Sequence, residues 1–199
     1  MADDTVVGHV TALRREGAAA RGAWVFRPGG SGLTMESRLK LAVLGDFKVF
    51  RDGEVISLPP SRKTRALLAY LAVVPRPQRR ERLCEMFWEV PDDPRGALRW
   101  SLSRIRQIAG SGQKNLVGAD RNTVWLDPDG FDCDFKPIAG LRPDQVDKLD
   151  TGTVEAIADS FRGGFLEDLY LPTCPEFEAW RVAHAEQSDL VARFIQSEG

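Results

Sequence analysis

Cysteine, histidine and long apolar runs are all scarce in this chain of 199 residues. The three cysteines Cys84, Cys133 and Cys174 are an odd number at unrelated spacings, which argues against a disulfide framework or a zinc site and is typical of a reducing cytoplasm. The two histidines, His9 and His184, have no partner at catalytic or metal spacing. We therefore expect a cytoplasmic protein that is not an enzyme and needs no cofactor or metal.

Membrane and calcium-binding signatures are missing as well. No segment approaches the ~20 apolar residues of a membrane span, and no signal peptide is present, so no membrane partner is expected. The acidic run Asp127, Asp129, Asp132 and Asp134 lacks the following Gly and Glu of an EF-hand loop. We interpret this run as a solvated linker between two domains, and His184 as part of a solvated helix face.

Charge is unevenly distributed, although the net charge is only −2. Residues 60–121 carry 13 basic and 6 acidic side chains, a net of +7, whereas residues 122–199 carry 6 basic and 16 acidic, a net of −10. A basic middle region joined to an acidic end indicates one module that faces a polyanion and another that faces something else.

The first part of the chain changes character at about residue 38. Residues 1–37 are rich in Gly, Ala and Arg and show no sustained period, which predicts a disordered lead-in. Residues 38–58 alternate apolar and polar side chains, and Asp52-Gly53 is a strong hairpin signal. We expect a small antiparallel sheet here.

Two helices are predicted next. Ser61 can cap the first, and the second runs from about Arg79 to Trp88. Arg62 and Lys63 stand at the start of the first helix, where cations oppose the helix dipole. A nearby phosphate would offset that cost, but ordinary solvated surface charge explains these residues equally well.

The stretch 93–110, DPRGALRWSLSRIRQIAG, predicts a helix over about 94–109. Asp93 and Pro94 suit its first turn, and Leu98, Leu102 and Ile105 recur on one stripe. The opposite arc has no acid and consists of Arg99, Trp100, Ser103, Arg104, Arg106 and Gln107. Such an arc suits contacts with phosphates and base edges, although an arginine-rich surface helix, or a Trp100 packed on other elements, remains an alternative.

Residues 116–126, LVGADRNTVWL, read as a hairpin directly after this helix, the position of a wing. The runs LAVLGDFKVFRDGEVISLPPSRKTRALLAYLA, RRERLCEMFW and DPRGALRWSLSRIRQIAG resemble the OmpR-type winged helix-turn-helix. More narrowly, they resemble the version in the antibiotic-regulatory-protein (SARP) family of bacterial transcriptional activators. FRGGFLEDLYLPTCPEFEAWRVAHAEQ resembles the start of that family's second, helical domain.

The resemblance implies an α+β fold with two parts. Residues 38–127 would form a winged helix-turn-helix with an N-terminal antiparallel sheet. Residues 131–199 would form an all-α, tetratricopeptide-like partial domain, truncated in comparison with that of its relatives. It implies sequence-specific binding of double-stranded DNA and regulation of transcription, with the helix of 94–109 in the major groove and the hairpin of 116–126 at the minor groove.

The family's motif can be carried over residue by residue. Arg104 and Trp100 match base-reading positions, Arg99, Ser103 and Arg106 lie nearer phosphates, Ser101 belongs to the same helix, and Arg121 is at the wing tip. With Arg62 and Lys63 as phosphate contacts, these make up the candidate DNA-binding set. The resemblance also implies direct repeats as the DNA site, a homodimer, and RNA polymerase as a partner. The competing hypothesis is a protein–protein interaction module that no longer binds DNA.

Overall fold

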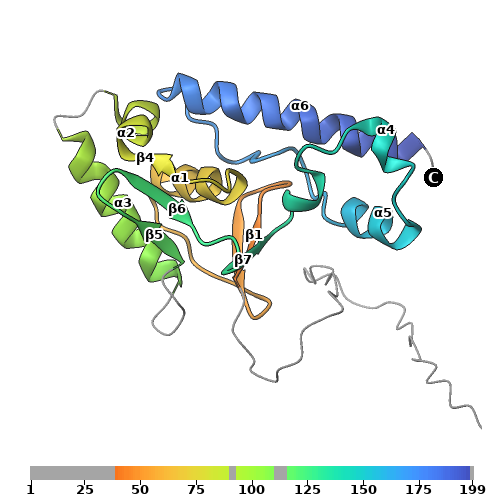
Figure 1. The fold of residues 1–199 in the computed structure, drawn as a ribbon, viewed down its shortest axis with the longest axis horizontal. Coiled ribbons are helices and arrows are strands. Elements are labelled where there is room, and N and C mark those ends of the chain that lie inside the picture. Colours follow the sequence, from red (N-terminus) through yellow and green to blue (C-terminus); the bar gives the residue numbers. More distant parts are fainter. Residues whose placement is uncertain (1–38, 90–92, 110–115, 198–199) are drawn as a thin grey trace, which may run out of the picture.

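The computed structural model describes residues 39–89, 93–109 and 116–197, and its elements follow the predicted order as far as the wing (Figure 1). The predicted lead-in of residues 1–37 lies outside the described residues. The elements up to the wing are β1 (Leu39–Ala42), β2 (Lys48–Arg51), β3 (Glu54–Val55), α1 (Arg62–Val73), β4 (Gln78–Arg79), α2 (Arg80–Trp88), α3 (Pro94–Ala109), β5 (Val117–Ala119) and β6 (Thr123–Leu126). The α+β class, with an N-terminal sheet that is largely antiparallel, is confirmed.

The first sheet has the order β3-β2-β1-β7, with β7 formed by Phe131–Cys133. β1 and β2 are antiparallel, and Leu41 lies opposite Val49, both of them buried. Asp52 (φ 52°) and Gly53 (φ 87°) both adopt the left-handed conformation that a tight two-residue hairpin turn requires. The hairpin that the Asp-Gly pair predicts is therefore present between β2 and β3.

β7 corrects the prediction that only helices follow the wing. It pairs in parallel with β1, so that Leu39 lies opposite Phe131 and Leu41 opposite Cys133. Phe131 and Cys133 are buried, which gives this short segment a reason to join the core. The predicted boundary at 127–131 therefore falls next to a strand of the first sheet rather than in a solvated linker.

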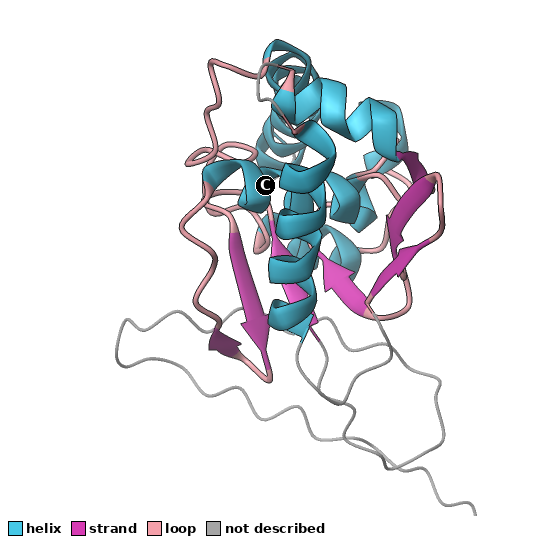
Figure 2. Cartoon of the chain, turned by 90° about the vertical axis from the view of Figure 1, so that its left-hand side faces the viewer, coloured by secondary structure: helices cyan, strands magenta, loops and turns pink. Residues whose placement is uncertain are grey.

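The three helices of the winged region share one core. Ser61 caps α1 as predicted, its hydroxyl accepting a hydrogen bond from the backbone N–H of Thr64 (3.3 Å). Asp93 likewise accepts a hydrogen bond from the N–H of Gly96 (2.7 Å) in the first turn of α3. Figure 2 shows strands on both flanks of the central helices.

The C-terminal part contains a 3-10 turn (Lys136–Ile138), α4 (Pro143–Val146), α5 (Thr151–Ala158) and α6 (Pro175–Ser197). In Figure 1, α6 extends from α2 along α1 toward α4. It is held by aromatic contacts: the ring centroids of Trp180 and Tyr70 are 4.9 Å apart, and those of Phe177 and Phe87 are 5.3 Å apart. A tetratricopeptide-like pairing of these helices stays a prediction.

His184 does not lie on a solvated helix face, and that prediction was wrong. Its ring is 4.6 Å from the centroid of Trp180 and stacks on Phe165 at 5.7 Å. The segment that carries Phe165 covers this part of α6, so the His184 ring packs among aromatic side chains. Among the described residues, no helix is long and apolar enough to cross a membrane.

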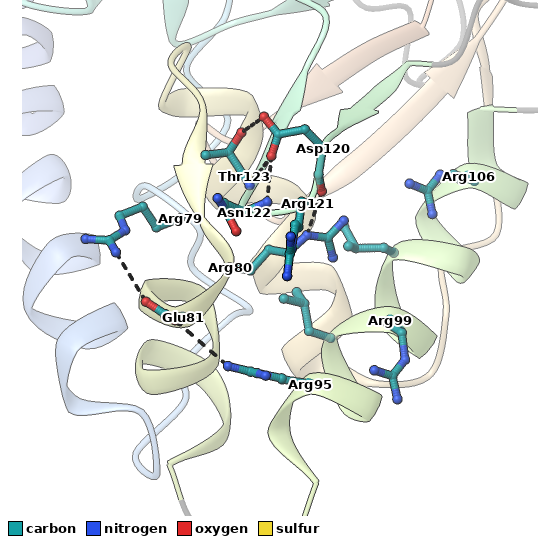
Figure 3. A pocket seen from close by; sticks show the side chains of 12 residues that line it. Arg79, Arg80, Glu81, Arg95, Arg99, Arg106, Asp120, Arg121, Asn122 and Thr123 are labelled. Carbon is teal, nitrogen blue, oxygen red and sulfur yellow. Dashed lines mark hydrogen bonds and ion pairs between the residues drawn. The ribbon is translucent and has the colours of Figure 1, made fainter.

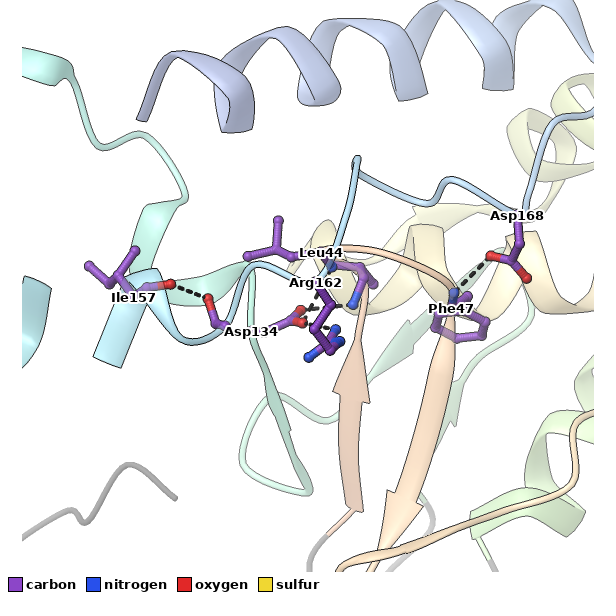
Figure 4. Close-up of polar contacts among 8 residues, drawn as sticks. Leu44, Phe47, Asp134, Ile157, Arg162 and Asp168 are labelled. Carbon is purple, nitrogen blue, oxygen red and sulfur yellow. Dashed lines mark hydrogen bonds and ion pairs between the residues drawn. The ribbon is translucent and has the colours of Figure 1, made fainter. Parts of the chain in front are cut away.

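A buried carboxylate joins the two parts of the chain (Figure 4). The Oδ1 of Asp134 accepts a hydrogen bond from the backbone N–H of Val43 (2.8 Å), and its Oδ2 accepts from Leu44 N–H (3.3 Å) and from the Arg162 guanidinium (2.7 Å). The Asp134 side chain is 2% exposed, and its burial raises the pKa of the carboxyl, against the opposite effect of its amide and guanidinium partners. The interpretation of Asp134 as part of a solvated linker was therefore wrong. We call this cluster the Asp134 joint.

Candidate nucleic-acid interface

A groove of about 1070 Å³ lies between α3, the start of α2 and the turn of the β5–β6 hairpin (Figure 3). Its charged lining is dominated by six arginines, Arg79, Arg80, Arg95, Arg99, Arg106 and Arg121, against the two acids Glu81 and Asp120. We call it the arginine groove. Such an excess of guanidinium groups creates a local positive potential suited to a polyanion.

The helical period of α3 places its arginines in solvent. Leu98, Leu102 and Ile105 are at most 1% exposed and anchor one side of the helix in the core. The opposite arc is exposed as predicted, comprising Arg99, Trp100, Ser103, Arg104, Arg106 and Gln107. Of these, Arg99 and Arg106 line the arginine groove, while Trp100, Ser103 and Arg104 lie outside it.

Trp100 remains 47% exposed, which is unusual for the largest apolar side chain. The guanidinium carbon of Arg104 lies 5.2 Å from the centroid of the Trp100 ring, a cation–π arrangement. Arg104 also donates a hydrogen bond to the Oε1 of Gln107 (3.0 Å). These contacts orient the Arg104 fork on the exposed face before any ligand binds.

Ser101 does not belong to the exposed face, so its place in the candidate set was wrong. It is 2% exposed, and its Oγ shares a 2.9 Å hydrogen bond with the Oγ1 of Thr64 on α1. Ser101 lies about 60° from Leu98 around the helix, so the period itself could have indicated burial. The residue ties α3 to α1 and cannot reach a ligand.

The hairpin turn is built around Asp120. Its carboxylate accepts hydrogen bonds from the backbone N–H groups of Asn122 (2.7 Å) and Thr123 (2.5 Å) and from the Thr123 hydroxyl (2.8 Å). Those backbone bonds lower the pKa of Asp120. The turn holds Arg121 exposed at its tip, as the wing prediction placed it.

Sequence reasoning missed one wall of the groove. β4 pairs antiparallel with β6, and the next residue, Arg80, donates its backbone N–H to Asn122 O (2.8 Å) and its Nε–H to Asp120 O (3.1 Å). This pairing brings Arg79 and Arg80 against the hairpin, and Arg95 completes the wall from the first turn of α3. The adjacent arginines at 79–80 and the net charge of the middle region were the available signals.

The two cations at the start of α1 are not part of the groove. Arg62 is exposed and donates to the backbone oxygen of Asp168 (2.9 Å), which gives it a protein partner in the C-terminal part. Lys63 is half-buried and has no ion pair with any described residue. Their role as phosphate contacts stays a prediction.

Most of the groove arginines remain available to a ligand. Arg79 and Arg95 share Glu81, at 3.3 Å and 3.9 Å, and Arg99 lies 3.6 Å from Asp93. These pairs are exposed, so water and salt weaken them. Guanidinium forks match the geometry of phosphate oxygens and bind them bidentately. Within the described residues, no group of His, Cys, Asp and Glu side chains is arranged to hold a metal ion.

Comparison with known proteins bears on the fold. No protein-family model matches the sequence, and no curated protein matches it significantly. Among solved structures, Mycobacterium tuberculosis EmbR in complex with a low-affinity phosphopeptide is similar, with 24% sequence identity and a TM-score of 0.61. The match covers 78% of this chain and 44% of the EmbR chain, so this chain spans less than half the length of that protein. At this identity, the likeness supports the shared fold and leaves the activity open.

Proposed function

We propose that this chain binds double-stranded DNA sequence-specifically and regulates transcription as a SARP-type activator. The observation that carries the proposal is the arginine groove, with six guanidinium groups between α3 and the wing, beside an exposed helix arc without acidic residues. Phosphates supply most of the affinity in such an interface, and base edges supply the specificity.

The exposed residues then divide by position. In a helix lying in the major groove, Arg104 and Trp100 contact base edges, because Arg can bond guanine O6 and N7 together and an aromatic ring can contact a thymine methyl. Arg99 and Arg106 bind phosphates in the groove, Ser103 contacts the backbone beside them, and Arg121 lies at the minor groove. Arg79, Arg80 and Arg95 add phosphate contacts, and Arg62 and Lys63 contact phosphate only.

The same proposal includes partners. An activator of this class acts in the cytoplasm on direct repeats, as a dimer of this chain, and makes contact with RNA polymerase. The exposed apolar side chains of α6, Val182 and Leu190, offer surface for such protein contacts.

Selection of bound sequences from a pool of random duplexes tests the proposal and reads repeat spacing in the same experiment. The expected result is an enriched sequence motif. The slope of log affinity against log salt should be negative by several units, as phosphate contacts require. Binding of no duplex at low salt would contradict it and favour the protein–protein module instead.

A further inference from the structure

We infer that Glu81 acts as a built-in counter-charge that weakens the grip of the arginine groove on phosphate and so limits binding to DNA of any sequence. This inference rests on the proposed DNA binding. The two acids of the groove, Glu81 and Asp120, differ in what their carboxylates contact.

Asp120 has a structural task, because its carboxylate holds two backbone amides and a hydroxyl of the hairpin turn. Glu81 has no comparable one. Its carboxylate meets only the guanidinium groups of Arg79 (3.3 Å) and Arg95 (3.9 Å) among the described residues, and its side chain is 62% exposed. Glu81 lies in the first turn of α2, where an acid favours the helix dipole, and its side chain neutralises two cations of the groove.

The position of Glu81 is effective for this purpose. Arg79 reaches it from the end of β4 and Arg95 from the first turn of α3, so one carboxylate lies between two walls of the groove. A phosphate that binds these guanidinium groups must displace the carboxylate and tolerate a like charge a few ångströms away. Because every duplex carries phosphates, the penalty falls on all sequences alike, and only sites with good base contacts overcome it.

The direct test is Glu81→Gln, which keeps the size of the side chain and removes its charge. The expected result is tighter binding to the preferred and to a random duplex alike, by about fivefold at low salt, the effect of one unit charge about 4 Å from another in water. The slope of log affinity against log salt should steepen by about one unit, because the freed cations bind one more phosphate.

Glu186→Gln is the matched control. It removes the same charge from the exposed face of α6, outside the groove. At about 0.1 M salt, screening confines the electrostatic effect of an exposed charge to about 10 Å around it. E186Q should therefore bind DNA as the parent does. An equal gain in both variants would mean that net charge alone is responsible, which overturns the inference.

A double-mutant cycle gives the sharper readout. If Glu81 neutralises Arg95, then Arg95→Ala costs little affinity in the parent and more in E81Q. If the affinity changes of E81Q and R95A simply add in the double variant, the inference is overturned. It is also overturned if E81Q binds DNA like the parent or more weakly. The same holds if E81Q melts at a lower temperature while its affinity is unchanged. If the parent binds no duplex, the proposed function itself fails. If the parent binds and E81Q does not differ, only the role of Glu81 fails.

Discussion

Arginines meet acidic side chains in two regions of this molecule, and the two arrangements are opposites. At the Asp134 joint, one carboxylate that is 2% exposed is satisfied by one guanidinium and two backbone amides. In the arginine groove, six guanidinium groups face two acids, and the ion pairs that form there are exposed. The first arrangement is closed to any ligand and the second is open to one.

The difference separates stability from binding. Removing one partner of a buried pair leaves an uncompensated charge and unsatisfied amides, which costs the fold heavily. Removing an exposed arginine costs the fold little and changes what the surface can bind. Substitutions at the joint should therefore destabilise the fold, and substitutions of the exposed arginines in the groove should change only ligand binding.

The largest effect is expected for Asp134→Ala. Loss of the carboxylate leaves the amides of Val43 and Leu44 and the charge of Arg162 without their partner, and we expect the free energy of unfolding to fall by about 3–5 kcal/mol. Urea denaturation measures this change. Asp189→Ala removes an exposed carboxylate on α6 and should stay within about 0.5 kcal/mol of the parent. Equal losses in both variants would show that the joint contributes nothing special.

The joint also predicts a dependence on pH. Burial raises the pKa of Asp134 above its ordinary value of 3.8, so the folded protein binds a proton at this carboxyl more tightly than the unfolded chain does. The stability that this pKa shift adds is present in full below pH 3.8 and is lost as the pH rises through the higher folded pKa, while the hydrogen bonds of the carboxylate remain. Asp134→Asn, which keeps an accepting oxygen, should cost less than Asp134→Ala and should remove this part of the pH profile.

Leu102→Ala tests a groove residue that is buried and so should affect the fold rather than binding. Leu102 lines the floor of the arginine groove but is 1% exposed, so its loss should cost about 2–5 kcal/mol of fold stability. Affinity for DNA should fall only in proportion to the unfolded fraction, as circular dichroism beside a binding assay would show. Loss of affinity in fully folded protein would mean that this leucine touches the ligand.

Local pattern predicted the three helices of the winged region and its two hairpins, but not the short strands β4 and β7 or the long-range contacts. The period of Leu98, Leu102 and Ile105 determines which side of α3 is buried, and the Asp-Gly pair defines the hairpin turn, because both signals lie within a few residues. β7 was missed because Phe131–Cys133 is short and its partner β1 is far away in the chain. Burial of Asp134 follows from that pairing and could not be found without it.

Arg104→Ala tests base reading on the exposed side of the comparison. We expect it to lose about 1–3 kcal/mol on the preferred site and to relax the choice at one base, while binding to random DNA changes little. Competition between preferred and random duplexes measures this ratio. Trp100→Ala is the companion variant, since the ring orients the Arg104 fork. If R104A binds every duplex as the parent does, α3 does not read bases.

The smallest effect is expected for Arg106→Ala. Arg106 lines the groove and has no ion pair with any described residue, so the fold should be unchanged. Binding to preferred and random duplexes should weaken alike, and the salt slope should flatten by about one unit. Lys63→Ala is expected to behave in the same way. An unaltered salt slope would remove either residue from the phosphate-binding set.

The candidate site was only partly predictable for the same physical reason. The exposed arc of α3 follows from a single helical period, and the tip position of Arg121 follows from the turn. Arg79 and Arg80 join them only because β4 pairs with β6, and Arg95 joins them from the first turn of α3. Ser101 is the reverse case, since the helical period alone places it on the buried side of α3, beside Leu98.

The parallel pairing of β7 with β1 has a consequence for the timing of folding. Asp134 and its partner Val43 are 91 residues apart, so the edge of β1 is complete only after the whole winged region has been synthesised and β7 has followed it. Until then the nascent chain presents an open strand edge, which can pair with a neighbouring chain. Such distant pairings also slow folding. A fragment cut at the end of the wing would keep that open edge permanently and should aggregate, whereas one extended through the end of α6 should remain dispersed.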